Sequence, residues 1–145
     1  MTTKTLRTSI WFGVVAVACS LSLGGCTEEK DYTLKATAAL PGAEGTATVW
    51  RDNLDETVVE IDAKYLTPPS ATKDPLYYVA WAEEGNTVKR LGTLRLEKDT
   101  GQLVSSTTLP HFNLAITAEE EPTPDKPQDK PILRTESPIY MDSST

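Results

Sequence analysis

Few side chains in this 145-residue chain could do covalent chemistry, because it has one histidine and two cysteines. His111 lies between Pro110 and Phe112, with no second metal ligand or acid–base partner at motif spacing. A general base needs a positioned partner, and a zinc site needs further ligands. Both cysteines precede residue 27, so the rest of the chain carries no thiol. We expect His111 to be an exposed turn residue, and we predict neither an enzyme nor a bound cofactor.

One loop could contribute oxygen ligands to a calcium ion, because four polar side chains fall within five positions: Asp52, Asn53, Asp55 and Glu56. Calcium takes six to eight oxygens, so this loop alone would not suffice. Asp and Asn also favour turns, since their side chains hydrogen-bond to the local backbone. We interpret the loop as a turn, assign no metal ligand, and keep calcium as the alternative.

Two other polar clusters have ordinary structural interpretations. The hydroxyl run 105–108 has no lysine or histidine at the spacing of an activated nucleophile, so we interpret it as strand. The charge run Glu119–Glu121 is typical of a solvated strand end.

Four aromatic residues could line a ligand groove: Trp50, Tyr77, Tyr78 and Trp81. Aromatic side chains in a small sandwich more often fill its core. Residues 76–82 are apolar on both faces, which is typical of a central strand. Tyr77 and Trp81 share one face of that strand, and Tyr78 lies on the other. We expect Trp81 to be structural, whereas an exposed aromatic pair would indicate a binding site.

The elements expected to position these residues are strands, because apolar and polar residues alternate with a period of two. A bulge at Gly92 would bring Leu91 into phase with Leu94. The expected strands cover 32–38, 46–51, 57–66, 76–82, 88–96, 103–109 and 112–118. This spacing, without any amphipathic helix, predicts an all-β fold: an immunoglobulin-like antiparallel β-sandwich of about seven strands. An open barrel is the alternative.

The first 25 residues have the form of a secretory signal. Lys4 and Arg7 precede an uncharged stretch that runs from Thr8 to Thr27 and has an apolar centre. An uncleaved membrane anchor is the alternative, because a bilayer is spanned by roughly 20 apolar residues.

The end of the apolar stretch, Leu23-Gly24-Gly25-Cys26, resembles the lipobox of bacterial lipoproteins. The resemblance implies that the Cys26 thiol receives a diacylglycerol and that cleavage makes Cys26 the new N-terminus. Each buried methylene contributes ~0.8 kcal/mol, so three acyl chains would hold the protein at a membrane without a spanning helix. Asp after the cysteine usually signals inner-membrane retention in Gram-negative bacteria. Thr27 stands there instead, which implies the outer membrane in such a source.

The chain therefore divides into a lipoprotein signal peptide over 1–25, a polar tether over 26–31, the sandwich over 32–118 and an acidic proline-rich tail over 119–145. The tail holds five of the ten prolines and seven acidic residues, a composition typical of disorder. Residues 132–135 could add one short closing strand, after which we expect disorder.

The net charge of the mature chain indicates which partners it would repel. Cleavage before Cys26 removes Lys4 and Arg7, so the net charge falls from −7 to −9. An acidic surface repels the phosphates of nucleic acid and of anionic lipid headgroups. We expect no nucleic-acid partner.

From about Tyr65 to Arg134 the chain resembles the extracytoplasmic C-terminal domain of anti-sigma-K factor proteins. The shared features are a proline loop, a Tyr-x-x-Trp strand, a glycine-bearing strand, an Asp-Gly type hairpin and a Phe-x-x-x-Thr-x-Glu strand before Pro-Thr. They correspond here to Pro68-Pro69, Tyr78 with Trp81, Gly92, Asp99-Thr100-Gly101, Phe112–Glu119 and Pro122-Thr123. The resemblance implies a domain that senses or binds. Family members also carry a sigma-binding domain and a spanning helix, where this sequence has a lipoprotein signal, so sigma sequestration does not carry over.

These observations predict a lipid-anchored cell-envelope protein whose non-catalytic β-domain serves protein binding, sensing or structural support. Its partners would be the membrane, through Cys26, and another envelope protein. Two alternatives stay open: a small sugar- or peptide-binding module that uses strand 76–82, and an accessory subunit of an envelope regulatory or secretion complex.

Overall fold

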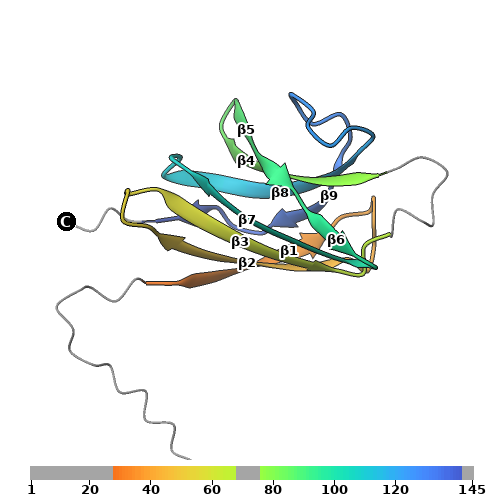
Figure 1. Ribbon diagram of the computed structural model, residues 1–145, viewed down its shortest axis with the longest axis horizontal. Coiled ribbons are helices and arrows are strands. Elements are labelled where there is room, and N and C mark those ends of the chain that lie inside the picture. The colour runs from red at the N-terminus through yellow and green to blue at the C-terminus, as the bar shows by residue number, and fades with distance from the viewer. Residues whose placement is uncertain (1–27, 68–75, 142–145) are drawn as a thin grey trace, which may run out of the picture.

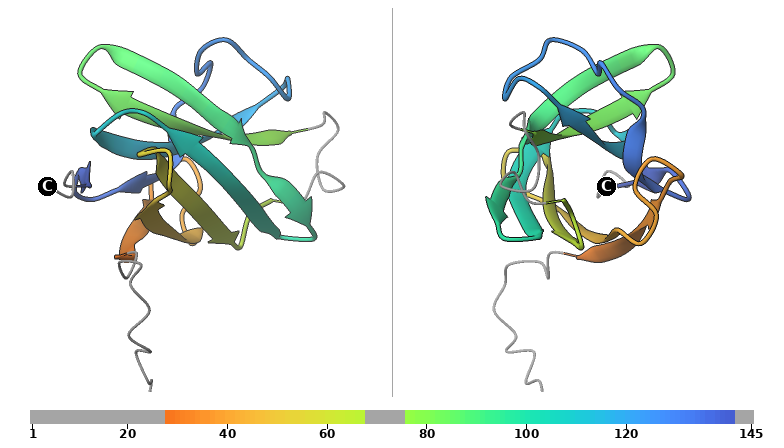
Figure 2. Two further views of the ribbon diagram at one scale, coloured as in Figure 1. Left: turned by 60° about the vertical axis from the view of Figure 1, so that its left-hand side comes forward. Right: turned by 90° about the vertical axis from the view of Figure 1, so that its right-hand side faces the viewer.

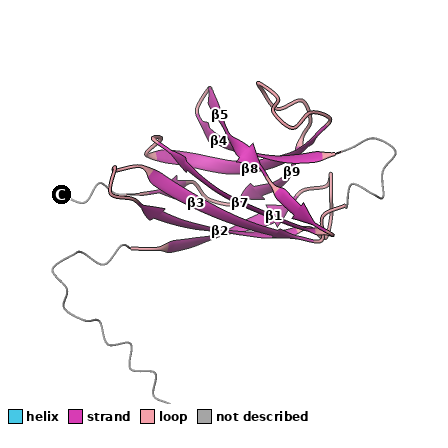
Figure 3. Ribbon diagram, in the orientation of Figure 1, coloured by secondary structure: helices cyan, strands magenta, loops and turns pink. Residues whose placement is uncertain are grey.

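The fold consists of ten antiparallel strands, which confirms the predicted all-β class (Figure 3). The computed structural model describes residues 28–67 and 76–141. The strands are β1 (Lys30–Ala36), β2 (Glu44–Arg51), β3 (Thr57–Lys64), β4 (Tyr77–Glu84), β5 (Thr87–Thr93), β6 (Arg95–Glu97), β7 (Thr100–Thr107), β8 (His111–Glu119), β9 (Pro131–Thr135) and β10 (Ile139–Tyr140) (Figure 1).

A single sheet curls round into a nearly closed barrel. The strands pair in the order β5-β4-β8-β9-β1-β2-β3-β7-β6, and β10 pairs with the start of β8. β5 and β6 are two parts of one bent strand that only Leu94 separates, so the chain itself joins the two ends of the sheet. The two layers of the predicted sandwich are opposite walls of this curled sheet, which brings the architecture close to the barrel alternative (Figure 2).

The bend in the β5–β6 strand lies where the sequence predicted a bulge. The register with β4 shifts between Ala80 and Trp81, which leaves Leu91 as the unpaired residue beside Gly92. A Cβ at Gly92 would lie 3.0 Å from a methyl group of Leu103 on β7, so a side chain there would crowd the neighbouring strand. Past the bend the strand leaves β4 and pairs with β7 as β6. The predicted bulge is confirmed.

The interior of the barrel is filled by alternate residues of its strands. In β3, Val59, Ile61 and Ala63 are buried, whereas Glu60 is exposed, as the alternation predicted. Tyr65, expected on the buried face, is 58% exposed, because β3 ends at Lys64 and the φ of Tyr65, +58°, turns the chain out of the strand geometry. The largest buried interior side chains are Tyr78, Phe112, Leu34, Ile61, Leu114, Ile116, Leu133 and Ile139.

The acidic proline-rich segment after β8 belongs to the fold as far as Met141. β9 pairs with both β8 and β1, which confirms the closing strand expected at 132–135. The expectation of disorder beyond it is wrong for residues 136–141, because Ile139 and Met141 are buried. A few apolar residues anchor this segment, and the proline-rich, acidic composition around them concealed that signal.

A second, smaller core lies on the outer face of β4 and β8. Trp81 and Ala115 face each other across these strands, and both are fully buried although they point away from the barrel interior. The loop 120–130 arches over this side of the barrel (Figure 2), and its hydrogen bonds to Arg90, which lies opposite Trp81, and to Glu119 place it over this outer face. Its Pro124 is buried, and the Pro124 carbonyl accepts a hydrogen bond from Arg90 at 2.5 Å. This loop explains why strand 76–82 is apolar on both faces.

The strands define two ends of the barrel, a tether end and a far end. The tether end carries the start of β1, the β2–β3 hairpin turn 52–56, the β4–β5 turn 85–86 and Met141. The far end carries the loops 37–43 and 120–130 (Figure 1).

Truncation of the Trp81 side chain tests whether the second core supports the fold. Replacing a buried Trp by Ala costs about 3–5 kcal/mol, so Trp81→Ala should lower the thermal midpoint by roughly 10–25 °C. Circular dichroism during thermal unfolding measures it. Trp50→Ala, at a half-buried outer position, is the control and should cost less. A Trp81→Ala midpoint within a few degrees of the parent would contradict the structural role.

Candidate functional site

The predicted lipid-attachment residue, Cys26, lies outside the described residues. The first strand begins at Lys30, four residues further along the chain. The lipid site is therefore a prediction of the sequence, and the structure places the point at which the chain enters the domain.

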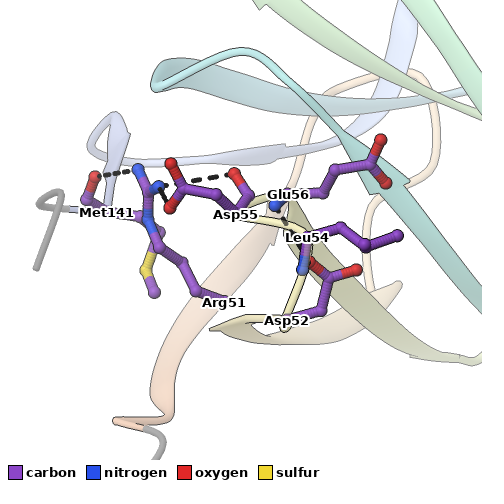
Figure 4. A network of polar contacts seen from close by, with 6 residues as sticks. All are labelled: Arg51, Asp52, Leu54, Asp55, Glu56 and Met141. Carbon is purple, nitrogen blue, oxygen red and sulfur yellow. Dashed lines mark hydrogen bonds and ion pairs between the residues drawn. The ribbon is translucent and has the colours of Figure 1, made fainter.

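The loop considered for calcium is a hairpin turn held by its own carboxylate. Asp52 Oδ1 accepts hydrogen bonds from the backbone amides of Leu54 and Glu56, both at 2.9 Å (Figure 4). The Asp52 amide in turn donates to the Glu56 carbonyl at 3.0 Å. Side-chain bonds of this kind are what make Asp a turn residue, so the turn interpretation is confirmed.

The other acidic side chains of this turn have partners of their own. Asp55 forms an ion pair with Arg51, whose Nη2 also donates to the Met141 carbonyl at 2.9 Å (Figure 4). Glu56 accepts a hydrogen bond from Ser106 at 2.9 Å. The carboxylates thus serve different partners, and in residues 28–67 and 76–141 no three His, Cys, Asp or Glu side chains are grouped to hold a metal ion.

His111 is exposed at the first residue of β8, as predicted. Its ring lies against that of Tyr140, with centroids 4.8 Å apart and an angle of 56° between the planes. The Tyr32 hydroxyl lies 3.4 Å from the backbone of Tyr140. His111 therefore belongs to a small aromatic cluster at the tether end, where β10 meets β8.

The hydroxyl run 105–108 contributes structural hydrogen bonds. Ser105 donates to the Leu91 carbonyl at 2.7 Å, across the seam between β5 and β7. Ser106 binds Glu56, and the Thr107 hydroxyl accepts from the Leu109 amide at 3.2 Å. These contacts agree with the interpretation of the run as strand.

The aromatic residues divide between the two cores. Tyr78 points into the barrel, where its hydroxyl donates to the Thr67 carbonyl at 3.0 Å. Trp81 lies in the outer core, and Trp50 and Tyr77 are half-buried. The burial predicted for Trp81 is confirmed, and β4 presents no fully exposed aromatic pair.

A chain of hydrogen bonds links Trp81 to the loop that covers it. Trp81 Nε1 donates to the Thr117 hydroxyl at 2.8 Å, and that hydroxyl donates to Glu119 Oε1 at 2.6 Å. The Gln128 amide also donates to the Glu119 carboxylate, at 3.1 Å to Oε1. A hydroxyl has one proton to donate, so these partners fix the direction of the chain from the ring to the carboxylate.

The interpretation of Glu119–Glu121 as a solvated charge run is wrong for Glu119. Its side chain is 1% exposed, whereas Glu120 and Glu121 are exposed. A carboxylate is buried at low cost only where hydrogen-bond donors satisfy it. Thr117 and Gln128 supply those donors.

Several recesses open on the described part of the barrel surface, and two of them differ in the charge of their linings. One, of about 460 Å³, lies at the far end and is lined by Glu119, Glu120, Glu121, Pro124, Gln128 and Asp129. The other, of about 660 Å³, lies over β1–β3 and includes Lys35, Glu44, Asp62 and Lys64 in its lining. The first recess is acidic and would favour a cationic group over an anionic one. The second mixes both signs of charge.

The alternation of side chains between the two faces of β8 is the signal that could have revealed the buried glutamate. Ala115, Thr117 and Glu119 occupy alternate positions of β8 and therefore share one face. That face adjoins the outer face of β4, which the sequence already predicted to be buried. Glu119 thus extends a covered row of side chains.

The chain matches no family model, no curated protein and no solved structure. Within residues 28–67 and 76–141 there is also no helix with the length and apolar character needed to span a bilayer. The likeness to the anti-sigma-K domain therefore stays a prediction of the sequence.

Removal of the Glu119 carboxylate should loosen the covering loop. Glu119→Ala leaves the Thr117 hydroxyl and the Gln128 amide without their acceptor, and we expect a loss of about 2–3 kcal/mol in the free energy of unfolding. The Gln128 amide should exchange hydrogen roughly tenfold faster or more. Denaturant unfolding and hydrogen exchange measure the two effects. Exposed Glu120→Ala is the matched control, and equal behaviour of the two variants would contradict the network.

The hairpin turn predicts independence from metal. A chelator should leave the thermal midpoint unchanged, because hydrogen bonds rather than an ion hold the turn. Asp52→Ala should cost about 1–2 kcal/mol, and Asp52→Asn should recover most of it because Oδ1 is retained. A midpoint that falls on chelation and recovers with calcium would restore the calcium interpretation.

Proposed function

We propose that this chain is a lipid-anchored cell-envelope protein whose β-domain is non-catalytic and serves protein binding, sensing or structural support. The likeness of residues 23–26 to a lipobox supports the anchor. The start of the domain at Lys30 supports it further, since only residues 27–29 then separate the anchor at Cys26 from the barrel.

One observation carries the non-catalytic part of the proposal. The polar groups that the sequence singled out as candidates for chemistry contribute to structure. Asp52 holds a turn, Glu119 holds the covering loop, and Ser105 bridges the seam of the barrel. A catalytic group must instead be free to exchange a proton or form a bond with a substrate, whereas these side chains are held by partners within the fold.

Burial of the aromatic strand weighs against the sugar- or peptide-binding alternative. Stacking on a sugar or peptide needs an exposed ring, and Tyr78 and Trp81 are at most 1% exposed. A role as an accessory subunit of an envelope complex is compatible with the same geometry and belongs within the proposal.

The location and partners follow from the anchor and the charge. Thr27 after the lipidated cysteine favours the outer membrane where the source has two membranes. The acidic mature chain disfavours nucleic acid. The partners proposed are thus the membrane, through Cys26, and another envelope protein.

Intact-mass analysis of the membrane fraction tests the proposal. The protein should begin at Cys26 and carry acyl chains, and Cys26→Ala should abolish the modification. Cys19→Ala is the matched control and should leave it intact, because Cys19 lies in the cleaved segment. A mature chain cut elsewhere and free of lipid would contradict the anchor.

A further inference from the structure

The β2–β3 hairpin projects beyond the point at which the chain enters the barrel. Lys30 lies opposite Val49, so the last two residues of β2 and the turn 52–56 extend past the start of β1. Two strand residues at about 3.3 Å each, with the turn beyond them, place the tip roughly 10 Å past Lys30.

The tether limits how far this tip can stand from a membrane. The four residue-to-residue steps from Cys26 to Lys30 span at most about 14 Å when fully extended. The headgroup layer on each side of a bilayer adds roughly 5–7 Å. Because barrel strands tilt by about 35–45° to the barrel axis, the tip stands about 7–8 Å closer to the anchor than Lys30, and it therefore lies within or against the headgroups even with the tether fully extended.

The residue at this tip is an exposed leucine on a firmly held turn. Leu54 is 80% exposed, the largest fraction among the exposed large hydrophobic residues of the described chain. Its backbone is fixed by Asp52, and the turn is braced by the Arg51–Asp55 ion pair and the bond from Arg51 to Met141 (Figure 4). These contacts hold the backbone that presents the Leu54 side chain to solvent.

Aromatic residues at the same end suit a headgroup environment. Tyr140 is 50% exposed, and Tyr32 and His111 lie beside it. Tyrosine is favoured at membrane interfaces because its ring is apolar and its hydroxyl remains hydrated.

We propose that the tether end rests on the membrane surface, with Leu54 at the level of the lipid headgroups. This inference depends on the lipid anchor proposed above. The partner is a zwitterionic lipid surface, because Glu28 and Glu29 of the tether would repel anionic headgroups. The acidic recess at the far end then faces away from the membrane.

A single thiol-linked probe can test this orientation, because Cys26 is the only cysteine in the mature chain and its thiol would carry lipid. Leu54→Cys and Tyr65→Cys would each be labelled with an environment-sensitive fluorophore in the full mature lipoprotein, reconstituted into phosphatidylcholine vesicles. Tyr65 is the matched control, since it is exposed at the far end of β3. A third protein would carry the Leu54 probe and twelve additional Gly and Ser residues after Thr27.

The probe at position 54 should shift to the blue on reconstitution and be quenched at least twofold by headgroup-labelled lipid, whereas the probe at 65 should not respond. Lengthening the tether should abolish most of the response. Equal responses at 54 and 65, or a response unaffected by the longer tether, would overturn the inference. Flotation of the same samples separates the two claims: protein that fails to float contradicts the anchor, whereas floating protein with a silent Leu54 probe contradicts only the orientation.

Discussion

Closure of the sheet through the bent β5–β6 strand is the constraint on which the rest of the structure depends. β5 pairs with β4 and β6 pairs with β7, so this strand joins what would otherwise be two open edges. Glycines allow the bent β5–β6 strand to pack closely against β7 along the seam where the barrel closes. A Cβ at Gly101 would lie 2.9 Å from Leu94, and one at Gly92 would meet Leu103. Once the seam is closed, the strands share one interior and their turns gather at two opposite ends, which separates the tether end from the far end.

The acidic segment after β8 has a structural role, which is to cover the outer core. The loop 120–130 covers Trp81, and the buried carboxylate of Glu119 receives donors from Thr117 and Gln128. Acidic side chains of the neighbouring residues then stand on a defined scaffold rather than on a mobile tail. If the tether end faces the membrane, this acidic surface is the part of the domain most accessible to another envelope protein.

The features that could be predicted from the sequence are those encoded by residues close together in the chain. The alternation in β3, the bulge beside Gly92 and the burial of β4 on both faces all depend on residues that lie close together in the sequence. Closure of the barrel depends on pairings such as Leu34 with Thr135, which no local period encodes. The burial of Glu119 was missed because a run of three glutamates is ordinarily solvated, and only the loop that returns over β8 removes one of them from water. Cys26 was identified from its motif alone and lies outside the described residues.

Neutron reflectometry on a supported phosphatidylcholine bilayer that carries the mature lipoprotein tests the central claim most directly, namely that a short lipid tether holds the barrel end-on at the membrane. Eight-residue strands at about 3.3 Å per residue, tilted by about 40° to the barrel axis, give a barrel length of roughly 20 Å. The profile should show a protein layer of about this thickness that begins within the headgroups, with no water-filled gap between them. A protein layer separated from the headgroups by a hydrated gap, or the absence of a protein layer, would contradict it.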